Sequence, residues 1–271
     1  MGHLARTTAF FYTQNIDFRK AIILTTNPLA QEVFKETPTI FMPLHLQENT
    51  IECAEFIANI IKLYAVQEVY IDSFPVGILG ELQNVDFSKV RVFYLARLLN
   101  WQKYRTLFQN INYVFEKVWI CEDLHAPHQD FIQKNAKSIS NITLTYPPEP
   151  FIDLRQYFQL KNELWLIIHS QPKGEVEDLY TYAKWVLDWK GSMADFVIIS
   201  ACRDLDIDAP NVYYFNTSAA YMYLPQADKI FTAAGFNLLQ QAAPYKEKHY
   251  VMPFQRGFDL QFERAKAYKK R

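Results

Sequence analysis

The sequence predicts an α/β protein of two domains, each built around a mainly parallel sheet. Short runs rich in β-branched and aromatic residues alternate with longer helical stretches, which is typical of layered α/β domains. A proline-rich segment, TYPPEP at 145–150, interrupts this alternation near the middle of the 271-residue chain. We therefore expect an N-terminal domain over 1–147, a C-terminal domain over 151–271, and a cleft between them that binds ligands at the carboxyl ends of strands.

In the first half, hydrophobic patterning places strands and one well-marked helix. Strands are expected at 20–25, 39–43, 68–72, 90–95, 117–121 and 141–145. The stretch NTIECAEFIANIIKLYA at 49–65 has apolar residues at helical spacing, and Asn49 and Glu52 are spaced like a capping box. The segment 89–105 mixes basic and aromatic residues; a membrane surface or RNA are alternatives, but a buried strand followed by an amphipathic helix is favoured.

In the second half the same rhythm restarts after the proline-rich segment. Strands are expected at 164–169, 196–200, 212–215, 229–231 and 249–252, and helices at 175–189, 236–243 and from Asp259 onward. Strands that alternate with helices in this way favour parallel pairing.

Composition limits the classes of function. The net charge of -1 gives no whole-molecule field that attracts nucleic acid or an anionic membrane. Three widely spaced cysteines, Cys53, Cys121 and Cys202, form no CxxC pair, so we expect three buried thiols in a reducing cytosol. No apolar run reaches 18 residues and no signal-peptide pattern is present. These features predict a cytoplasmic protein with at most a peripheral contact with the inner face of the membrane.

Two segments resemble metal sites without meeting their requirements. RDLDIDAP at 203–210 places Asp204, Asp206 and Asp208 at alternating positions, but no glycine or closing glutamate follows at calcium-loop spacing. HAPH at 125–128 is interrupted by proline and is interpreted as a surface loop. We expect neither a metal nor a cofactor.

The strongest chemical signal lies near the C-terminus. ADKIFTAAGFNLLQQA at 227–242 predicts a strand, a turn at Gly235, and a helix whose first turn holds Asn237. The amide groups and positive dipole end of such a helix suit a phosphate, although any strand-to-helix turn can use one glycine. HYVMPFQRGFDLQFERA at 249–265 then predicts a strand, a polar loop with Gln255, and a helix start carrying Asp259 and Gln261.

The opening stretch MGHLART has the composition of a turn that feeds a phosphate-binding helix, with Gly2, His3 and Arg6 in it. No strand precedes the turn to deliver the chain to it. One hypothesis is that the missing first strand lies upstream of Met1, which leaves the N-terminal domain without that strand.

The order of these motifs resembles the two-domain GT-B glycosyltransferases, and above all the group that includes the bacterial enzyme adding N-acetylglucosamine to a lipid-linked peptidoglycan precursor. GHLART resembles the loop after that group's first strand, and VYIDSFPVGILGEL at 69–82 resembles an Asp-x-Phe-Pro-x-Gly segment of predicted glycosyltransferases. The resemblance implies two Rossmann-like domains, with an acceptor on the N-terminal side and a nucleotide-activated sugar on the C-terminal side.

The resemblance also implies roles for particular residues. His3 is the candidate catalytic base and Asp72 a second catalytic candidate, the alternatives being an exposed side chain near a frayed terminus and a turn cap. The implied donor-binding residues are His169, Ser170, Gly235, Asn237, Gln241, Gln255, Asp259 and Gln261. Gln241 stands where relatives often carry a glutamate that grips the ribose, which weakens nucleotide affinity.

The resemblance implies a metal-independent glycosyltransferase that moves a sugar from a nucleotide-diphosphate donor, most simply a UDP-sugar, to an acceptor hydroxyl. Two alternatives stay open. One is a non-catalytic module that binds a nucleotide-sugar or glycan, which the shortage of glycine, seven in the chain, and Gln241 favour. The other is a hydrolase that uses water as the acceptor.

Overall fold

A computed structural model describes residues 2–202 and 204–270 of the chain. The described residues divide into two compact units. The C-terminal unit holds residues 147–256 and 261–270 together with 2–6, and the N-terminal unit holds 7–146 together with 257–260. Each unit therefore contains a short segment from the far end of the sequence.

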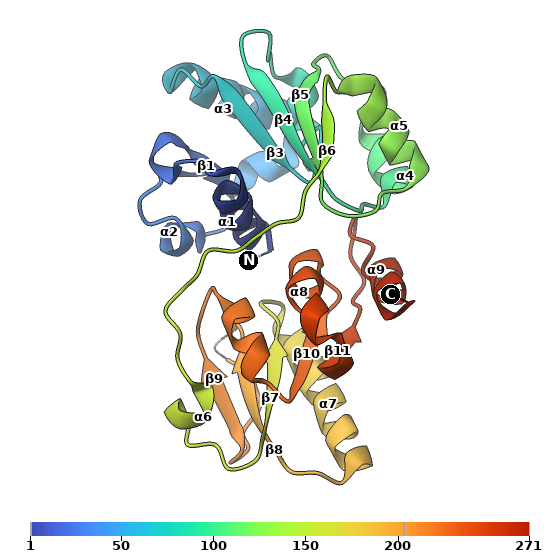
Figure 1. The fold of residues 1–271 in the computed structure, drawn as a ribbon. Coiled ribbons are helices and arrows are strands. Elements are labelled where there is room, and N and C mark those ends of the chain that lie inside the picture. Colours follow the sequence, from blue (N-terminus) through green and yellow to red (C-terminus); the bar gives the residue numbers. More distant parts are fainter. Residues whose placement is uncertain (1, 203, 271) are drawn as a thin grey trace. The chain divides into compact units, whose positions relative to one another are not determined.

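The C-terminal unit is built on a parallel sheet (Figure 1). Its strands are β7 (Glu163–Ile168), β8 (Ala194–Ile199), β9 (Val212–Phe215), β10 (Lys229–Ala233) and β11 (His249–Met252). They lie in the order β11-β10-β7-β8-β9. The chain adds strands outward from β7 on one side and then returns to build β10 and β11 on the other, so the strand order reverses between β7 and β10.

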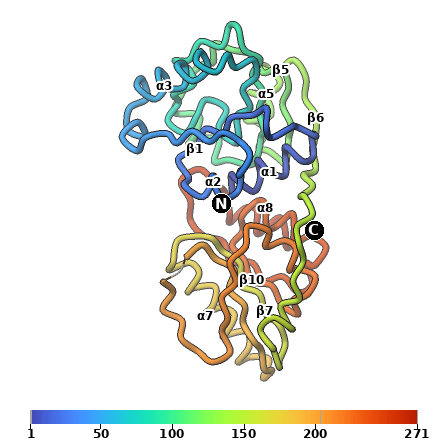
Figure 2. Tube along the Cα trace, turned by 90° about the vertical axis from the view of Figure 1, so that its left-hand side faces the viewer, coloured from blue at the N-terminus to red at the C-terminus, as the bar shows by residue number. Residues whose placement is uncertain are grey.

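Helices cover both faces of this sheet, as Figures 1 and 2 show. The long helix α7 (Lys173–Lys190) packs Val176, Leu179 and Ala183 against the fully buried Trp165 on one face. The other face is covered by α6 (Leu154–Tyr157), α8 (Phe236–Gln241) and the 3-10 segment Ala220–Gln226. The last helix, α9 (Gln261–Lys270), packs Ala265 near β11. Two-sided burial explains why β7 and β8 read as continuous apolar runs.

The described part of the N-terminal unit contains two parallel sheets, in the orders β1-β2 and β3-β4-β5-β6. The strands are β1 (Ile23–Thr25), β2 (Thr39–Phe41), β3 (Glu68–Asp72), β4 (Arg91–Ala96), β5 (Phe115–Ile120) and β6 (Ile139–Asn141). The helices are α2 (Ala30–Val33), α3 (Thr50–Leu63), α4 (Trp101–Tyr104) and α5 (Ala126–Asn135), together with α1 (Gly2–Gln14) from residue 7 onward.

The core of the N-terminal unit is aromatic. The predicted helix at 49–65 is confirmed as α3, whose Asn49 cap accepts hydrogen bonds from the backbone N–H groups of Ile51 and Glu52. Its buried face packs with Tyr94 and Phe115 of the larger sheet. Helix α1 packs Phe10 against Trp119, with ring centroids 4.9 Å apart.

Several boundaries in the first half differ from those predicted. The predicted strand at 20–25 is shorter, because Asp17 caps a 3-10 turn at Phe18–Lys20. The strand predicted at 141–145 instead ends at Asn141, where its pairing with β5 ends. The predicted helix at Asp259 begins at Gln261, because Asp259 forms an isolated bridge with Leu99.

Two segments predicted as loops are helical. GHLART is the start of α1, in which Leu4 and Phe11 lie two turns apart on one face and are both buried. HAPH is the start of α5, where Pro127 occupies the first turn, a position that tolerates its missing N–H group. His128 is buried there, so the prediction of a surface loop at 125–128 was wrong.

Candidate functional site

The reversal of strand order identifies the place in the C-terminal unit best suited to a ligand. At such a switch point the loops that leave neighbouring strands turn in opposite directions and leave a crevice at the carboxyl ends. Here the two loops follow β7 and β10. The predicted residues His169 and Ser170 directly follow β7, and Gly235 and Asn237 follow β10. Three of the four residues therefore belong to the segments that leave β7 and β10, and Asn237 lies in the first turn of α8 directly after them.

His169 is held by a carboxylate and a guanidinium. Its Nε2 lies 2.7 Å from Oε2 of Glu175, in the first turn of α7. Arg256, which follows β11, donates to both carboxylate oxygens, and its NH1 lies 2.5 Å from Oε1. The His169 ring also stacks on Phe254, with centroids 5.6 Å apart. These contacts tie the loop after β7 to the loop after β11.

The protonation of this group follows from its surroundings. Burial lowers the pKa of His169, and the hydrogen bond with Glu175 opposes that shift without reversing it. Burial by itself raises the pKa of Glu175, but the hydrogen bonds of Arg256 and then His169 outweigh it and lower the pKa. His169 is therefore neutral near pH 7 and donates from Nε2 to an ionised Glu175.

Asn237 connects the start of α8 to the start of the chain. Gly235 is the N-cap residue of α8, and space around its Cα is open, with no atom within 4 Å of the position a Cβ would take. Asn237 is 9% exposed and its Nδ2 donates to the carbonyl oxygen of Gly2 at 2.7 Å. Its Oδ1 is buried without a hydrogen-bond partner among the described residues. The two stretches predicted to meet a phosphate are thus in contact.

His3 and Arg6 lie one turn apart on α1. Arg6 is 3% exposed, its NH2 lies 3.0 Å from Nδ1 of His3, and its guanidinium lies 5.8 Å from the centre of the Phe236 ring. Arginine can only donate, so Nδ1 of His3 accepts and the ring carries its proton on Nε2. His3 is exposed, and Arg6 fixes its tautomer.

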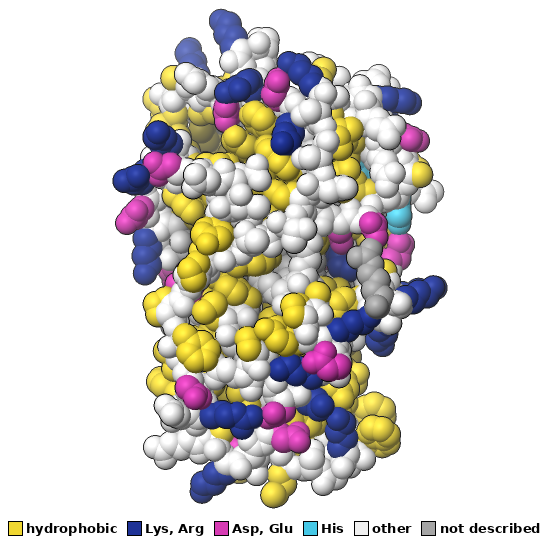
Figure 3. Space-filling view, in the orientation of Figure 1, with side chains coloured by type: hydrophobic (Ala, Val, Ile, Leu, Met, Phe, Trp, Pro, Cys, Tyr) yellow, Lys and Arg dark blue, Asp and Glu magenta, His cyan; other side chains and the backbone are white. Residues whose placement is uncertain are grey.

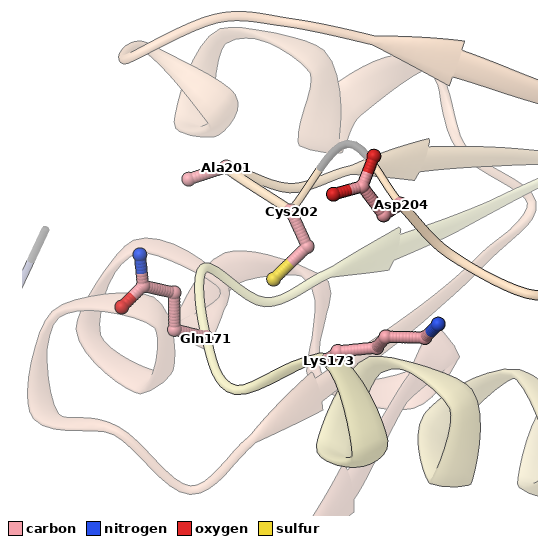
Figure 4. Close-up of a pocket in the computed structure, with 5 residues that line it drawn as sticks. All are labelled: Gln171, Lys173, Ala201, Cys202 and Asp204. Carbon is pink, nitrogen blue, oxygen red and sulfur yellow. The ribbon is translucent and has the colours of Figure 1, made fainter.

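A pocket of about 360 Å³ opens at the loops after β7 and β8 in the C-terminal unit. Its described lining comprises Gln171, Lys173, Ala201, Cys202 and Asp204, from the loops after β7 and β8 and the first turn of α7 (Figure 4). Cys53 and Cys121 are buried as predicted, but Cys202 is only half-buried because it lines this pocket. Its Sγ lies 3.4 Å from the carbonyl oxygen of Ser170.

The remaining predicted donor-binding residues of this unit differ in how far they are exposed to solvent. Gln241 is the last residue of α8 and is half-buried, and Gln255 is exposed after β11. Gln261 is 5% exposed, and its Oε1 accepts a hydrogen bond of 3.0 Å from the backbone N–H of Phe254. Gln261 thus braces the loop after β11.

Asp72 and Asp259 lie in the N-terminal unit, where a buried arginine connects them. Arg97 donates from Nε to Oγ of Ser73 at 2.8 Å and from NH1 to Oδ1 of Asp259 at 2.6 Å. The hydroxyl of Ser73 in turn donates to Oδ1 of Asp72 at 3.1 Å. Ser73 has a left-handed backbone, with φ of 72°, and the Tyr94 hydroxyl donates to its carbonyl oxygen. Asp259 is therefore part of a polar chain that begins at the end of β3.

Three charged side chains that organise these sites carried no assigned role in the sequence-based prediction. Glu175 was only a helix-start signal, Arg256 a residue of a polar loop, and Arg97 one of several basic residues in 89–105. Each acts through a partner far away in the sequence. Among the described residues, no three histidine, cysteine or acidic side chains gather to hold a metal, and no helix is long and apolar enough to cross a membrane. Asp206 instead pairs with Lys173 at 2.7 Å.

Comparisons with known proteins bear on the fold. The chain is similar to Spinosyn Forosaminyltransferase SpnP, with a TM-score of 0.62 and 9% identity over 99% of this chain and 80% of that one. It is also similar to Spinosyn Rhamnosyltransferase SpnG complexed with thymidine diphosphate, with a TM-score of 0.52 and 8% identity over 93% of this chain and 77% of that one. No protein-family model and no curated protein matches the sequence.

These similarities define the class of fold. The chain has the α/β architecture of GT-B glycosyltransferases, with Rossmann-like units and mainly parallel sheets, as predicted. At identities of 8% and 9% the likeness extends to the fold and not to a shared substrate. The finer resemblance to the peptidoglycan-precursor group stays a prediction.

Proposed function

We propose that the protein is a glycosyltransferase whose C-terminal unit binds a nucleotide-diphosphate sugar at the switch point between β7 and β10. The observation that carries the proposal is the fold, a parallel α/β sheet of GT-B type in which β7 and β10 are neighbours. The sequence-predicted residues His169 and Ser170 follow β7, and Gly235 and Asn237 follow β10, which supports a site at the carboxyl ends of these two strands. The named thymidine diphosphate of the similar SpnG structure supports a nucleotide-diphosphate ligand of this kind.

In this proposal the diphosphate lies near the starts of α7 and α8. The 18-residue α7 has no side-chain cap, so the backbone N–H groups of Lys173 and Gly174 point toward the carboxyl ends of the sheet. The positive end of its dipole favours a dianionic group there. Lys173 lies in the same first turn and pairs with the exposed Asp206, so a bound diphosphate would compete with that carboxylate for it. The pocket lined by Gln171 and Cys202 adjoins this helix start and offers room for the rest of a nucleotide. The ion pair of Glu175 and Arg256 keeps the two loops in place.

The proposed reaction needs no metal bound to the protein. The acceptor oxygen attacks the anomeric carbon, the bond from that carbon to the diphosphate oxygen breaks, and the diphosphate leaves with the bonding electrons. Backbone N–H groups at the helix starts stabilise the charge that develops on it. A base takes the proton of the acceptor hydroxyl.

His3 is the base that we propose for this step. It follows Gly2, whose carbonyl oxygen accepts the hydrogen bond from Asn237, so the candidate base and the candidate diphosphate site belong to one unit. In the geometry described, Nδ1 of His3 accepts from Arg6. Proton transfer to Nδ1 therefore requires Arg6 to move, and His3→Ala should abolish turnover while nucleotide binding persists.

Calorimetric titration of the purified chain tests the proposal. The ligands are UDP, dTDP, ADP and GDP, followed by UDP-N-acetylglucosamine, and we expect a uracil or thymine diphosphate to bind. Gly235→Trp should weaken that binding by at least about tenfold, or about 1.4 kcal/mol, because its side chain would extend into open space at the start of α8.

Gly257→Trp is the matched control, because space around Gly257 is equally open and Gly257 is exposed in the N-terminal unit. Its binding should equal that of the wild type. Binding of no nucleotide by the folded wild type would contradict the proposal. Binding without turnover for any acceptor would favour the non-catalytic module, and release of free sugar without an acceptor would favour the hydrolase.

A further inference from the structure

Helix α7 carries an exposed ridge of large apolar side chains at the end remote from the proposed ligand site. Trp185 and Trp189 lie one turn apart and are 68% and 80% exposed. Met193, directly before β8, is 75% exposed. We call these three residues the tryptophan ridge. Figure 3 shows hydrophobic side chains at the surface over this end of α7, at the lower right, beside lysine or arginine side chains.

The ridge is not part of the face by which α7 packs against the sheet. The opposite face of the helix is buried by Val176, Leu179, Ala183 and Val186, which fill the core against the sheet. Single exposed apolar side chains are common, but neighbouring ones on a helix that already has a complete buried face form a second apolar face, which indicates a contact surface. The ring of Tyr182 stacks on Trp185 at 6.4 Å and supports it from the side.

Lysines flank the ridge on both sides. Lys184 precedes Trp185, with its Nζ 5.4 Å from the centre of the Tyr180 ring. Lys190 follows Trp189 and lies 5.8 Å from the centre of the Tyr250 ring. A hydrogen bond with Tyr250 raises the pKa of Lys190, so it stays charged at neutral pH. Asp188 is the acidic residue between the two indoles.

We propose that the tryptophan ridge is a peripheral membrane anchor that inserts into the interface of an anionic bilayer. Tryptophan concentrates at the level of lipid headgroups, where its ring is in apolar surroundings and its N–H group in polar ones. Flanking lysines meet anionic headgroups, and their stems extend beside the buried indoles. Because the ridge lies at the amino end of β8 and the proposed ligand site at the carboxyl end of β7, anchoring would leave that site open to water.

The size of the ridge argues against a second copy of the chain as the occupant. At these exposures the two indoles present at most about 400 Å², taking about 250 Å² for a whole tryptophan side chain. A stable protein interface buries about 800 Å² on each partner. A bilayer needs no such area, because a few interfacial side chains and basic charges together give reversible binding.

Sedimentation with vesicles tests the anchor. Wild-type protein should pellet with vesicles of phosphatidylcholine and phosphatidylglycerol at 7:3, and far less with phosphatidylcholine alone. The double variant Trp185→Ser/Trp189→Ser should lose at least about tenfold in partitioning, since both the apolar area and the aromatic anchors are removed. Lys184→Glu/Lys190→Glu should lose binding to the anionic vesicles. Phe262→Ser is the matched control, because Phe262 is 56% exposed on α9 away from the ridge.

Fluorescence quenching gives a second measurement, which reports insertion of the indoles themselves and not only attraction of the lysines to anionic headgroups. Brominated lipids should quench the emission of Trp185 and Trp189 but not that of the buried Trp101, Trp119 and Trp165, which are 4%, 7% and 0% exposed. Wild-type protein that binds neither kind of vesicle, or a double variant that binds as well as the wild type, would overturn the proposal. A dimer in light scattering that dissociates in the double variant would also overturn it and assign the ridge to self-association.

Discussion

Replacing His128 with glutamine should remove the part of the acid sensitivity of the fold that this buried imidazole contributes. His128 is 1% exposed, its ring stacks on Trp101 with centroids 4.0 Å apart, and its Nε2 lies 3.1 Å from the Tyr94 hydroxyl. Burial lowers the pKa of His128 from 6.5 to about 3, and the nearby His125 adds to the shift. The folded protein therefore keeps this imidazole neutral at every pH above about 3.

The sign and size of the effect follow from proton linkage. The unfolded chain binds a proton at His128 with a pKa near 6.5, whereas the folded chain does so only near 3. Stability is therefore fully present above pH 6.5 and is lost as the pH falls from 6.5 toward 3. At pH 5, which is 1.5 units below the unfolded-state pKa, the unfolded chain is stabilised by binding a proton at His128 and the folded chain is not. This difference lowers the free energy of unfolding by about 2 kcal/mol relative to pH 7.

Urea unfolding at pH 7 and pH 5 measures this loss. His128→Gln should be less stable than the wild type at pH 7, but its further loss on going to pH 5 should be smaller by about 2 kcal/mol. Phe131→Leu, in the same helix, is the control, because it destabilises the same core and keeps the histidine. If His128→Gln and the wild type lose the same amount between the two pH values, the buried neutral histidine is refuted.

Two further substitutions test buried polar contacts by urea unfolding. Tyr104→Phe should lower the free energy of unfolding by about 2 kcal/mol, because the fully buried hydroxyl accepts from the N–H of Val76 and donates to the carbonyl oxygen of Gly77. A loss near zero would contradict this. Arg97→Met should lower the free energy of unfolding by about 3 kcal/mol, because it leaves the carboxylate of Asp259 without its guanidinium. Arg91→Met removes an exposed ion pair and should lower it by less than about 1 kcal/mol. Equal losses in the two variants would contradict the burial of the first pair.

The sequence predicted the C-terminal unit more closely than the N-terminal one, and the reason is burial. The strands at 164–169 and 196–200 are covered on both faces, so their apolar runs are unbroken and their limits differ from the observed ones by at most two residues. In the N-terminal unit β1 and β6 are three-residue strands, with little side-chain pattern to identify them.

Helices α1 and α5 were missed because their first turns resemble other structures. Gly2 and His3 are typical of a ligand-binding turn, and the burial of Phe10 against Trp119 that makes the segment helical is a contact between residues far apart in the sequence. Pro127 suggested a loop, although proline is equally common in the first helical turn.

In the candidate site, too, the features set by local sequence were predictable and those set by long-range contacts were not. The loops after β7 and β10 were predicted from local pattern, since a strand followed by a helix places its turn at the carboxyl end of the sheet. The contacts that organise them were not predictable locally: Asn237 reaches Gly2 across 235 positions, and Arg97 reaches Asp259 across 162. A single sequence records no signal for such pairs.

Amide hydrogen exchange with and without saturating UDP, or whichever nucleotide diphosphate binds most tightly, tests the central claim most directly. The account predicts slower exchange at residues 169–175, which follow β7, and at 233–239, from the last residue of β10 into α8. It predicts unchanged exchange at 185–193, at the far end of α7. Protection confined to the N-terminal unit, or at 185–193 without 169–175 and 233–239, would contradict a nucleotide site at the switch point.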